Sequence, residues 1–238
     1  MTIEMPRDCA KPSLLSSLRE MGTPLEFLKF PLMTASLFSA PRGDGRRIVL
    51  LPGFTSPELA MQPLTTYLSF LGYDASTWGL GFNGGDVDGL TEKFGVGIEK
   101  MANQNDEPVT LIGWSLGGVI ARETARLFSD SVREIITMGS PLIGGPKYTS
   151  VGAIYSRLNS LDEDAFEQEI HERNLLGLKQ PITAIYSKSD GVVGWKAAID
   201  VYNDQTNHIE VRSTHFGLGV NSKVWRIVAD TLAESNPV

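Results

Sequence analysis

Short apolar runs alternate along the chain with longer stretches in which apolar residues recur every three or four positions. The short runs predict strands, most of them buried on both faces because they lack an alternation of polar and apolar side chains. The predicted strands are residues 47–51, 73–80, 109–112, 134–139, 182–186 and 208–212, and helical spacing predicts helices over 58–71, 90–101, 195–202, 223–233 and from 119 onward. In the first of these helices, Leu59, Leu64, Leu68 and Leu71 are expected to face inward. This alternation predicts an α/β fold with a mostly parallel central sheet flanked by helices.

The alternation is interrupted between residues 142 and 180. Two helical segments, 148–158 and 162–174, follow one another there without a strand between them. We expect an insertion at this place to form a small helical cap over one edge of the sheet. Its acidic residues are expected on the solvated face of the cap rather than in a metal site, and they are Asp162, Glu163, Asp164 and Glu167.

The first 45 residues precede the first predicted strand and are expected to form an N-terminal arm, with the main domain spanning 46–238. Residues 1–13 are polar and are expected to be a poorly ordered tail. The following segment, 13–38, is unusually apolar, and Leu14, Leu15, Leu18 and Met21 have helical spacing. Such a segment could form a flap over an apolar pocket or contact a lipid surface. We favour an arm packed on the core, since apolar residues at helical spacing usually face a protein interior.

Composition narrows the class of protein. The 238 residues fit one domain, and a net charge of −7 without any basic run argues against a nucleic-acid partner. The single cysteine, Cys9, excludes an internal disulfide and is expected to have no catalytic role. The N-terminus lacks the apolar segment of a secretory signal, and no apolar run is long enough to insert stably in a membrane. We therefore expect a cytoplasmic protein, while its oligomeric state is left open.

The most informative motif is GWSLGG at residues 113–118. It fits the pattern Gly-x-Ser-x-Gly, follows a predicted buried strand and precedes a predicted helix. In that context the serine is held in a strained turn that lifts its hydroxyl above the sheet edge, next to a helix N-terminus. Although the bare pattern is common in glycine-rich chains, the strand and helix around it favour Ser115 as a nucleophile.

Two further residues follow later predicted strands directly. These are Asp190, after 182–186, and His215, after 208–212. Because parallel strands bring their carboxyl ends to one edge of a sheet, the two side chains are expected to meet Ser115 there. Imidazole has a pKa suited to activating a hydroxyl, and a carboxylate fixes the tautomer of the imidazole. Neither of the other histidines is a convincing base, since His171 lies in a charged helical stretch and His208 begins a strand at the opposite edge.

A nucleophilic serine also needs backbone donors for the oxyanion that forms on its substrate. The N–H of Leu116, directly after the serine, is one candidate. The loop after the strand 47–51 should supply the second, and Phe54 is the best candidate there because Gly53 allows a close approach of the backbone. The glycine-rich loop at 79–89 has neither the placement nor the charge of a phosphate cradle, so no cofactor is assigned. The spacing of the histidines likewise predicts no metal site.

The motifs GWSLGG, LLPGF, YSKSDGVVGW and EVRSTHFGLGV resemble those of the α/β-hydrolase superfamily, within a bacterial esterase- and lipase-like group, over roughly residues 46–236. The resemblance implies Ser115 as nucleophile, Asp190 as acid, His215 as base, and Phe54 and Leu116 as oxyanion donors. Pro52-Gly53 stands where His-Gly is often found, and Gly194 stands where a proline often follows DGVV, which suggests a more mobile acid loop. The absence of an HGGG motif argues against the hormone-sensitive-lipase-like branch.

These observations predict a serine hydrolase that cleaves a small carboxylic ester with an apolar acyl group through an acyl-enzyme. Trp114, Trp195 and Phe216 flank the candidate triad in sequence and are candidate pocket residues, although Trp114 could equally serve packing. The modest cap favours acyl chains of short to medium length. An acyltransferase using the same triad is an alternative that the sequence does not separate from a hydrolase. A non-catalytic binding protein is disfavoured because all three triad positions are intact.

Overall fold

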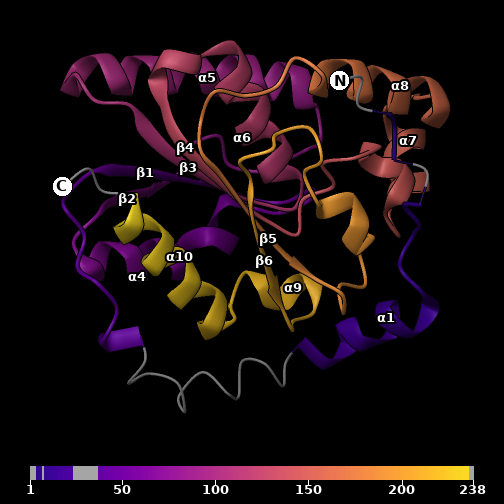
Figure 1. The fold of residues 1–238 in the computed structure, drawn as a ribbon, viewed down its shortest axis with the longest axis horizontal. Coiled ribbons are helices and arrows are strands. Elements are labelled where there is room, and N and C mark those ends of the chain that lie inside the picture. Colours follow the sequence, from indigo (N-terminus) through magenta and orange to yellow (C-terminus); the bar gives the residue numbers. More distant parts are fainter. Residues whose placement is uncertain (1–3, 7, 24–36, 236–238) are drawn as a thin grey trace.

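The structure, a computed structural model, describes residues 4–6, 8–23 and 37–235 (Figure 1). Within them, six strands form a single parallel sheet in the order β2-β1-β3-β4-β5-β6. The strands are β1 (Arg47–Leu51), β2 (Asp74–Thr77), β3 (Val109–Trp114), β4 (Val132–Met138), β5 (Ile182–Ser187) and β6 (Asn207–Val211). The prediction of a parallel α/β sheet is confirmed.

The strand order changes direction between β1 and β3. From β1 the chain goes to the edge strand β2, crosses back to β3 and then adds β4, β5 and β6 in succession. In open α/β sheets, ligands bind beyond the carboxyl ends of the strands at such a switch point. The loop after β1 and the turn after β3 therefore lie where a ligand site is expected.

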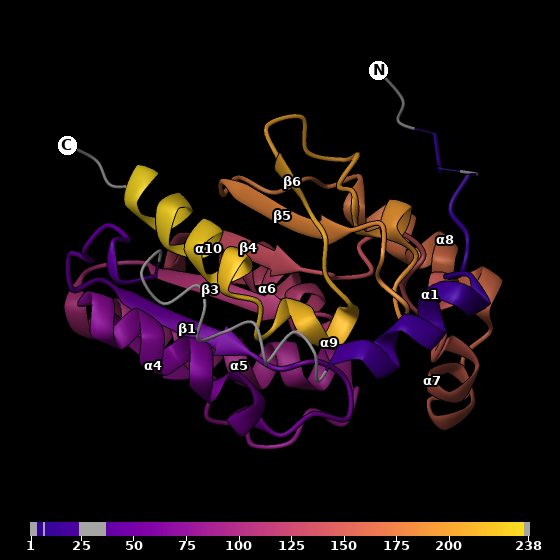
Figure 2. The same ribbon diagram turned by 90° about the horizontal axis from the view of Figure 1, so that it is seen from below.

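Helices cover both faces of the sheet (Figures 1 and 2). On one face, apolar side chains of α4 (Gln62–Leu71) and α10 (Ser222–Glu234) pack with those of β1, β3 and β4. On the other face, α5 (Val87–Asn105) and α6 (Leu116–Leu127) pack against the opposite side chains of the same strands. The central strands are thus buried on both faces, as their continuous apolar runs predict.

One helix prediction fails in its first turn. Residues Glu58–Met61 form a 3₁₀ helix, η3, ahead of α4. Leu64, Leu68 and Leu71 face the core as expected, but Leu59 is 68% exposed. The 3₁₀ turn has three residues per turn rather than 3.6, so the inward spacing of α4 does not extend to Leu59.

The segment predicted as a cap contains a 3₁₀ turn, η5 (Gly145–Tyr148), followed by α7 (Gly152–Leu158) and α8 (Glu163–Asn174). These elements lie together beyond the sheet edge (Figure 1). Asp162 caps α8, with its side chain accepting hydrogen bonds from two backbone N–H groups. Glu167, which was expected to face solvent, is instead buried, and it accepts hydrogen bonds from the Tyr148 hydroxyl and the Lys147 ammonium group.

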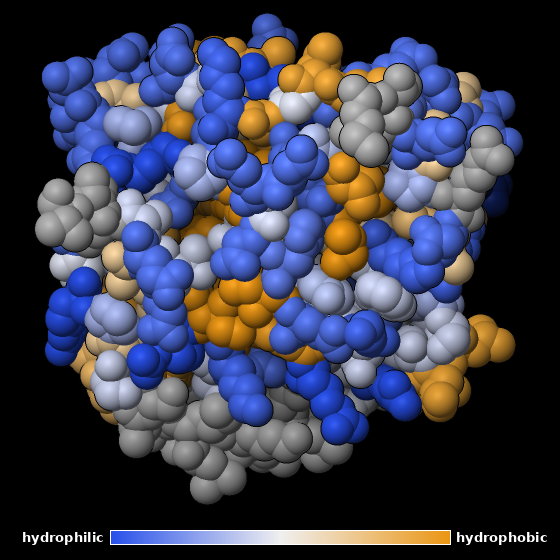
Figure 3. Space-filling model, viewed as in Figure 1, coloured by the Kyte–Doolittle hydropathy of each residue, from blue (hydrophilic) through white to orange (hydrophobic). Residues whose placement is uncertain are grey.

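The N-terminal segment contains α1 (Leu14–Arg19), which continues into the 3₁₀ turn η1 (Glu20–Gly22). The leucines predicted to face the core do not do so, since Leu14 is 86% exposed and Leu15 and Leu18 are exposed as well. Apolar side chains of α1 are visible at the surface in Figure 3, on a face that is otherwise mostly hydrophilic. The apolar residues of 24–36 lie outside the described residues. None of the described helices combines the length and the apolar character that crossing a membrane requires.

Candidate active site

Ser115 lies in a strained turn between β3 and α6. Its φ of 55° and ψ of −125° are values that non-glycine residues rarely adopt. The turn is fixed by two backbone hydrogen bonds, from the Ser115 N–H to the Met138 carbonyl (2.8 Å) and from the Gly118 N–H to the Ser115 carbonyl (3.0 Å). The serine therefore sits at the carboxyl end of β3, directly before the first residue of α6.

Glycines on both sides make room for this turn. A Cβ atom on Gly117 would lie 2.4 Å from the Leu51 carbonyl oxygen, and one on Gly113 would lie 2.3 Å from Gly118. Both distances are far below van der Waals contact and involve backbone atoms. Strand β3 and helix α6 can approach each other and β1 this closely only with glycine at these positions.

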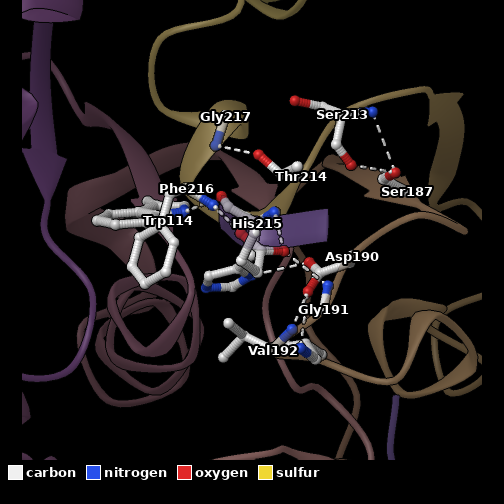
Figure 4. A network of polar contacts seen from close by, with 12 residues as sticks. Trp114, Ser187, Asp190, Gly191, Val192, Ser213, Thr214, His215, Phe216 and Gly217 are labelled. Carbon is white, nitrogen blue, oxygen red and sulfur yellow. Dashed lines mark hydrogen bonds and ion pairs between the residues drawn. The ribbon is translucent and has the colours of Figure 1, made fainter. Parts of the chain in front are cut away.

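Asp190 and His215 meet at the carboxyl ends of β5 and β6 (Figure 4). His215 Nδ1 lies 2.7 Å from Asp190 Oδ2, and both side chains are almost completely buried. The other carboxylate oxygen, Oδ1, accepts hydrogen bonds from the N–H groups of Val192 (2.8 Å) and Val193 (2.7 Å). Asp190 is thereby fixed in a single orientation toward the imidazole.

This geometry determines the tautomer of His215. An ionised carboxylate only accepts hydrogen bonds, so the proton of the Asp190–His215 contact belongs to Nδ1. In the neutral imidazole, Nε2 then carries a free electron pair. Within the described part of the chain, Nε2 has no hydrogen-bond partner. Neutral His215 with this tautomer offers Nε2 as the proton acceptor that general-base chemistry requires.

Between Ser115 and His215 no hydrogen bond is formed among the described residues. Trp114, which precedes Ser115, connects the serine to His215. Its indole N–H donates to the His215 carbonyl (3.1 Å), and the centroids of the Trp114 and His215 rings lie 5.6 Å apart. In unliganded sites the bond between nucleophile and base is often long and tightens when substrate binds. The structure thus brings Asp190 and His215 into direct contact. Ser115 directly follows Trp114, whose indole is hydrogen-bonded to the backbone of His215.

The two rival histidines are engaged elsewhere. His171 Nδ1 lies 2.7 Å from the Tyr202 hydroxyl, and His208 Nε2 accepts a hydrogen bond from the Asp200 N–H (3.0 Å). Neither has Asp190 as a partner.

Two backbone N–H groups near Ser115 are available for an oxyanion. Among the described residues, neither the Leu116 N–H, at the start of α6, nor the Phe54 N–H, in the loop after β1, has a hydrogen-bond acceptor. Gly53 brings this loop close to the serine, since a Cβ there would lie 3.1 Å from Ser115 Cβ. The Pro52 carbonyl accepts a hydrogen bond from the Asn83 side-chain amide (2.8 Å), which fixes the start of this loop.

Asn83 supports the loop after β1, which the sequence analysis did not foresee. It is fully buried in the glycine-rich loop, and its backbone exchanges hydrogen bonds with the N–H of Thr55 and the carbonyl of Ser56. The loop at 79–89 therefore supports the loop that carries Phe54. An asparagine among glycines carries no pattern that would have predicted this.

An apolar cavity opens beside Ser115 on the α6 side of the sheet. Half of its walls come from the segment 142–180, and a polar end is formed by Arg122, Glu123, Arg173 and Asn174. The other lining residues are Phe54, Val87, Ser115, Leu116, Val119, Pro141, Leu142, Gly145, Pro146, Thr149, Val151, Tyr155, Phe166, Ile170, Val192 and Val193. Burial raises the pKa of Tyr155 to about 12, so its hydroxyl stays protonated and donates to the Gly85 carbonyl.

The three aromatic residues proposed for the pocket are not among those that line this cavity. Trp114 belongs to the core on the α10 face of the sheet, because its side chain follows the alternation of β3. Phe216 packs against Trp114, and Trp195 stacks on Tyr186 beyond β5. None of the three aromatic residues thus lines this cavity, whereas Phe54 does.

Two further kinds of chemistry were considered in the sequence analysis, namely a reactive cysteine and a metal site. Burial, with smaller contributions from Asp8 and Glu167, raises the pKa of the Cys9 thiol to about 11, which makes it a poor nucleophile at neutral pH. Across the described residues, no three side chains among His, Cys, Asp and Glu gather as a metal ion would require.

A second residue missed by the sequence analysis is Glu20 in η1. Its carboxylate accepts hydrogen bonds from the N–H groups of Gly191, next to Asp190, and of His215 itself. Nothing in the sequence pattern links this glutamate to positions so far along the chain.

Comparison with known proteins gives a family match and several similar structures. Residues 59–216 match the family described as PGAP1-like alpha/beta domain. A pimeloyl-[acyl-carrier protein] methyl ester esterase of Aliivibrio salmonicida is 32% identical over 108 residues, which are 45% of this chain and 41% of the relative. The corresponding esterase of Shewanella woodyi is 31% identical over 110 residues. The chain thus spans less than half the length of the curated relatives it matches.

Among solved structures, the Bacillus licheniformis lipase BlEst2 has a TM-score of 0.61 at 14% identity, covering 82% of this chain and 94% of the lipase. The α/β hydrolase MGS-MChE2, from the metagenome of lagoon sediments of Mar Chica, Morocco, has a TM-score of 0.56 at 19% identity, with 81% and 93% covered. At these identities the likeness concerns the fold. Together with the parallel sheet and the turn at Ser115, these matches show that the chain belongs to the PGAP1-like α/β domain family, within the α/β-hydrolase superfamily.

Proposed function

We propose that this protein is a serine hydrolase of carboxylic esters, with Ser115 as nucleophile, His215 as general base and Asp190 as the acid that orients it. The observation that carries the proposal is the buried contact of His215 Nδ1 with Asp190 Oδ2, at the sheet edge where Ser115 occupies a strained turn. The similarity to esterases over 108 residues supports the same class of reaction.

In the proposed reaction, His215 Nε2 takes the proton of the Ser115 hydroxyl as the serine oxygen attacks the ester carbonyl. The carbonyl oxygen becomes an oxyanion, which the free N–H groups of Leu116 and Phe54 stabilise. The imidazolium then gives its proton to the leaving alcohol, and an acyl-enzyme remains on Ser115. His215 then takes a proton from water as the water oxygen attacks the acyl-enzyme, and the imidazolium returns that proton to Ser115 Oγ as the acid is released.

The apolar cavity beside Ser115 is proposed to hold the acyl group. We also propose that residues 142–180 act as the cap, since they supply half of the cavity wall, and that residues 1–45 form an arm on the domain 46–238. An apolar lining gains free energy by removing the acyl chain from water, at about 0.8 kcal/mol per CH₂. Small esters with short to medium apolar acyl groups are therefore the proposed substrates.

The test is hydrolysis of p-nitrophenyl esters of graded acyl length by the native protein and by Ser115→Ala. We expect the substitution to lower kcat by about 10³-fold or more, because the acyl-enzyme no longer forms. Far-UV and near-UV circular dichroism should show an unchanged fold. Equal rates in both proteins would exclude Ser115 as the nucleophile.

A matched control is Ser140→Ala, which removes a nearby buried hydroxyl that has no hydrogen-bond partner among the described residues. It should retain the native rate. Product analysis with added alcohol then identifies the acyl acceptor: free acid supports a hydrolase, and exclusive transfer to the alcohol would replace this proposal with an acyltransferase.

A further inference from the structure

The N-terminal arm reaches the candidate site through a single carboxylate. Glu20 lies in η1, immediately after α1, and both Glu20 oxygens point to backbone N–H groups of the acid and base loops. Oε1 accepts from Gly191 (2.7 Å) and from His215 (2.8 Å), and Oε2 accepts from Phe216 (3.2 Å). In both ribbon views α1 lies beside α9 (His215–Leu218), the short helix that begins at the candidate base.

The three donors belong to the loops after β5 and β6, which carry Asp190 and His215, and the contact between these two side chains depends on how the loops are placed. Gly191 directly follows Asp190, His215 carries the imidazole itself, and Phe216 directly follows His215. Because one oxygen accepts from both segments, Glu20 ties the backbone of the acid to the backbone of the base. The side-chain contact of 2.7 Å between them depends on that backbone separation.

The contact is closely fitted. A Cβ atom on Gly191 would lie 2.3 Å from the Ser16 carbonyl oxygen and 2.8 Å from Glu20 Cγ, so the arm rests on this glycine. The Ser17 hydroxyl donates to the Gly191 carbonyl (2.9 Å), and the hydroxyls of Thr23 and Thr214 lie 2.9 Å apart. These contacts approach the same two loops from the same side.

Hydrophobic burial does not explain how α1 and η1 are held. Helix α1 has no buried residue, and its leucines face solvent. The described contacts of the segment with the acid and base loops are polar, and Glu20 makes three of them. Hydrogen bonds to a charged acceptor are about twice as strong as neutral ones.

We propose that Glu20 is a positioning residue, which holds Asp190 and His215 in the geometry that general-base chemistry requires. This inference rests on the proposed function. Glu20 does not line the cavity and does not touch the reacting atoms, so its effect on the reaction passes through the acid and base loops.

The principal variants are Glu20→Ala and Glu20→Gln. The alanine removes all three acceptors. Glutamine keeps one acceptor oxygen, which can still serve Gly191 and His215, but turns its NH₂ group toward the Phe216 N–H. We expect kcat to fall by about 10- to 100-fold in Glu20→Ala and by only a few-fold in Glu20→Gln, with KM nearly unchanged.

Asp8→Asn is the matched control. It also removes one negative charge from the N-terminal segment, but its partner is the Lys196 ammonium group rather than a triad loop. Native kcat in Asp8→Asn together with loss in Glu20→Ala would support positioning by Glu20. An equal loss in both would overturn it in favour of a general effect of the arm, as would native kcat in Glu20→Ala.

The second readout does not depend on any substrate. The proton between His215 Nδ1 and Asp190 is expected to give a far-downfield ¹H NMR signal, which Asp190→Asn identifies by its loss. We expect this signal to broaden or shift in Glu20→Ala and to be largely retained in Glu20→Gln and Asp8→Asn. An unchanged signal in Glu20→Ala would overturn the proposal.

This pair of measurements separates the two proposals. If the native protein hydrolyses no ester, the proposed function fails, and the NMR comparison still decides whether Glu20 positions the pair. If Glu20→Ala does not fold, as judged by circular dichroism, kcat of Glu20→Gln decides: native kcat would overturn the proposal, and a few-fold loss of kcat with unchanged KM would support it.

Discussion

The placement of Ser115 depends on the glycines next to it in the turn. Its left-handed φ costs free energy, of the order of 1–3 kcal/mol, which the surrounding structure has to offset. Gly117 allows α6 to approach the end of β1, and this close packing holds the turn in place. The strain and the packing are therefore parts of one arrangement.

A substitution at Gly117 should break that arrangement. Gly117→Ala places a methyl group 2.4 Å from the Leu51 carbonyl, so backbone must move. We expect the free energy of unfolding to fall by about 1–3 kcal/mol. Urea titration followed by circular dichroism measures it.

Gly97→Ala is the control for this prediction, since nothing lies within 4 Å of its Cβ position and the residue is inside α5. Alanine there should raise the free energy of unfolding by about 0.4–1 kcal/mol. A loss of similar size at both positions would indicate that the close approach to the Leu51 carbonyl is not what makes Gly117→Ala destabilising.

The contributions of single residues were the hardest to predict from sequence. The pattern around Ser115, Asp190 and His215 is local to strand ends, so the contact of Asp190 with His215 follows once a parallel sheet is assumed. The role of Glu20 has no local pattern, because its partners are 171 and 195 positions away. Helix α1 and the turn η1 dock through polar groups, and hydropathy therefore pointed to the wrong face of α1.

At the scale of elements, a buried ion pair connects the helix after the nucleophile with the loop that follows β5. Arg122 of α6 donates to Asp200 Oδ2 at 2.5 Å, and both side chains are almost inaccessible to solvent. Asp200 also accepts from Asn203 (2.7 Å) and from the Tyr202 N–H (2.9 Å). Although burial by itself would raise the pKa of Asp200, these partners hold it below its usual value.

Removal of one partner from this pair should be costly, because the other charge stays buried. We expect Arg122→Met to lower the free energy of unfolding by about 3–5 kcal/mol. Arg47→Met, which breaks a partly exposed pair with Asp74, should cost about 0–1 kcal/mol. Chemical denaturation of both variants measures the two free energies of unfolding. A similar decrease in both would contradict the importance assigned to burial of the Arg122–Asp200 pair.

Strands and helices in which the spacing of apolar residues is unambiguous were predicted best. Strand β1 has the predicted bounds, and the other strands differ by a few residues at their ends. Short helical features were often missed, and two examples are the 3₁₀ character of 58–61 and the four-residue helix α9 that begins at His215. Both are shorter than the five or more residues over which a helical spacing becomes visible, so only tertiary contacts define them.

At the scale of the whole molecule, the stability should depend on pH in the acidic range through Asp200. Its pKa is lower in the folded protein than the value of about 3.9 in the unfolded chain. Its contribution to stability is therefore complete above that value and is lost as the pH falls through the folded pKa.

We expect the free energy of unfolding of the native protein to decline more steeply below about pH 4 than that of Asp200→Asn, which has no proton to bind at this position. Urea unfolding at a series of pH values measures both slopes. Parallel curves would show that other carboxylates account for the acid sensitivity.

The alternation of strands and helices predicted a parallel sheet but not its order. That order requires the chain to pass from the edge strand β2 back across β1 to β3, and only the packing of whole helices on the two faces determines such a crossing. The interruption of the alternation at 142–180 and an apolar cavity beside it were predictable, whereas most of the side chains that line this cavity were not.

The contacts of Glu20 also bear on how the protein is made. A ribosome synthesises Glu20 and Ser115 well before Gly191 and His215, so the growing chain carries a nucleophile without its base and a carboxylate without its three donors. Under the assignments proposed above, no nascent chain that stops before α9 can hydrolyse an ester, however well its first strands have folded. Activity would then appear only after His215 has been synthesised, and a coupled translation assay of chains stopped before and after α9 would record ester hydrolysis in the longer chain alone.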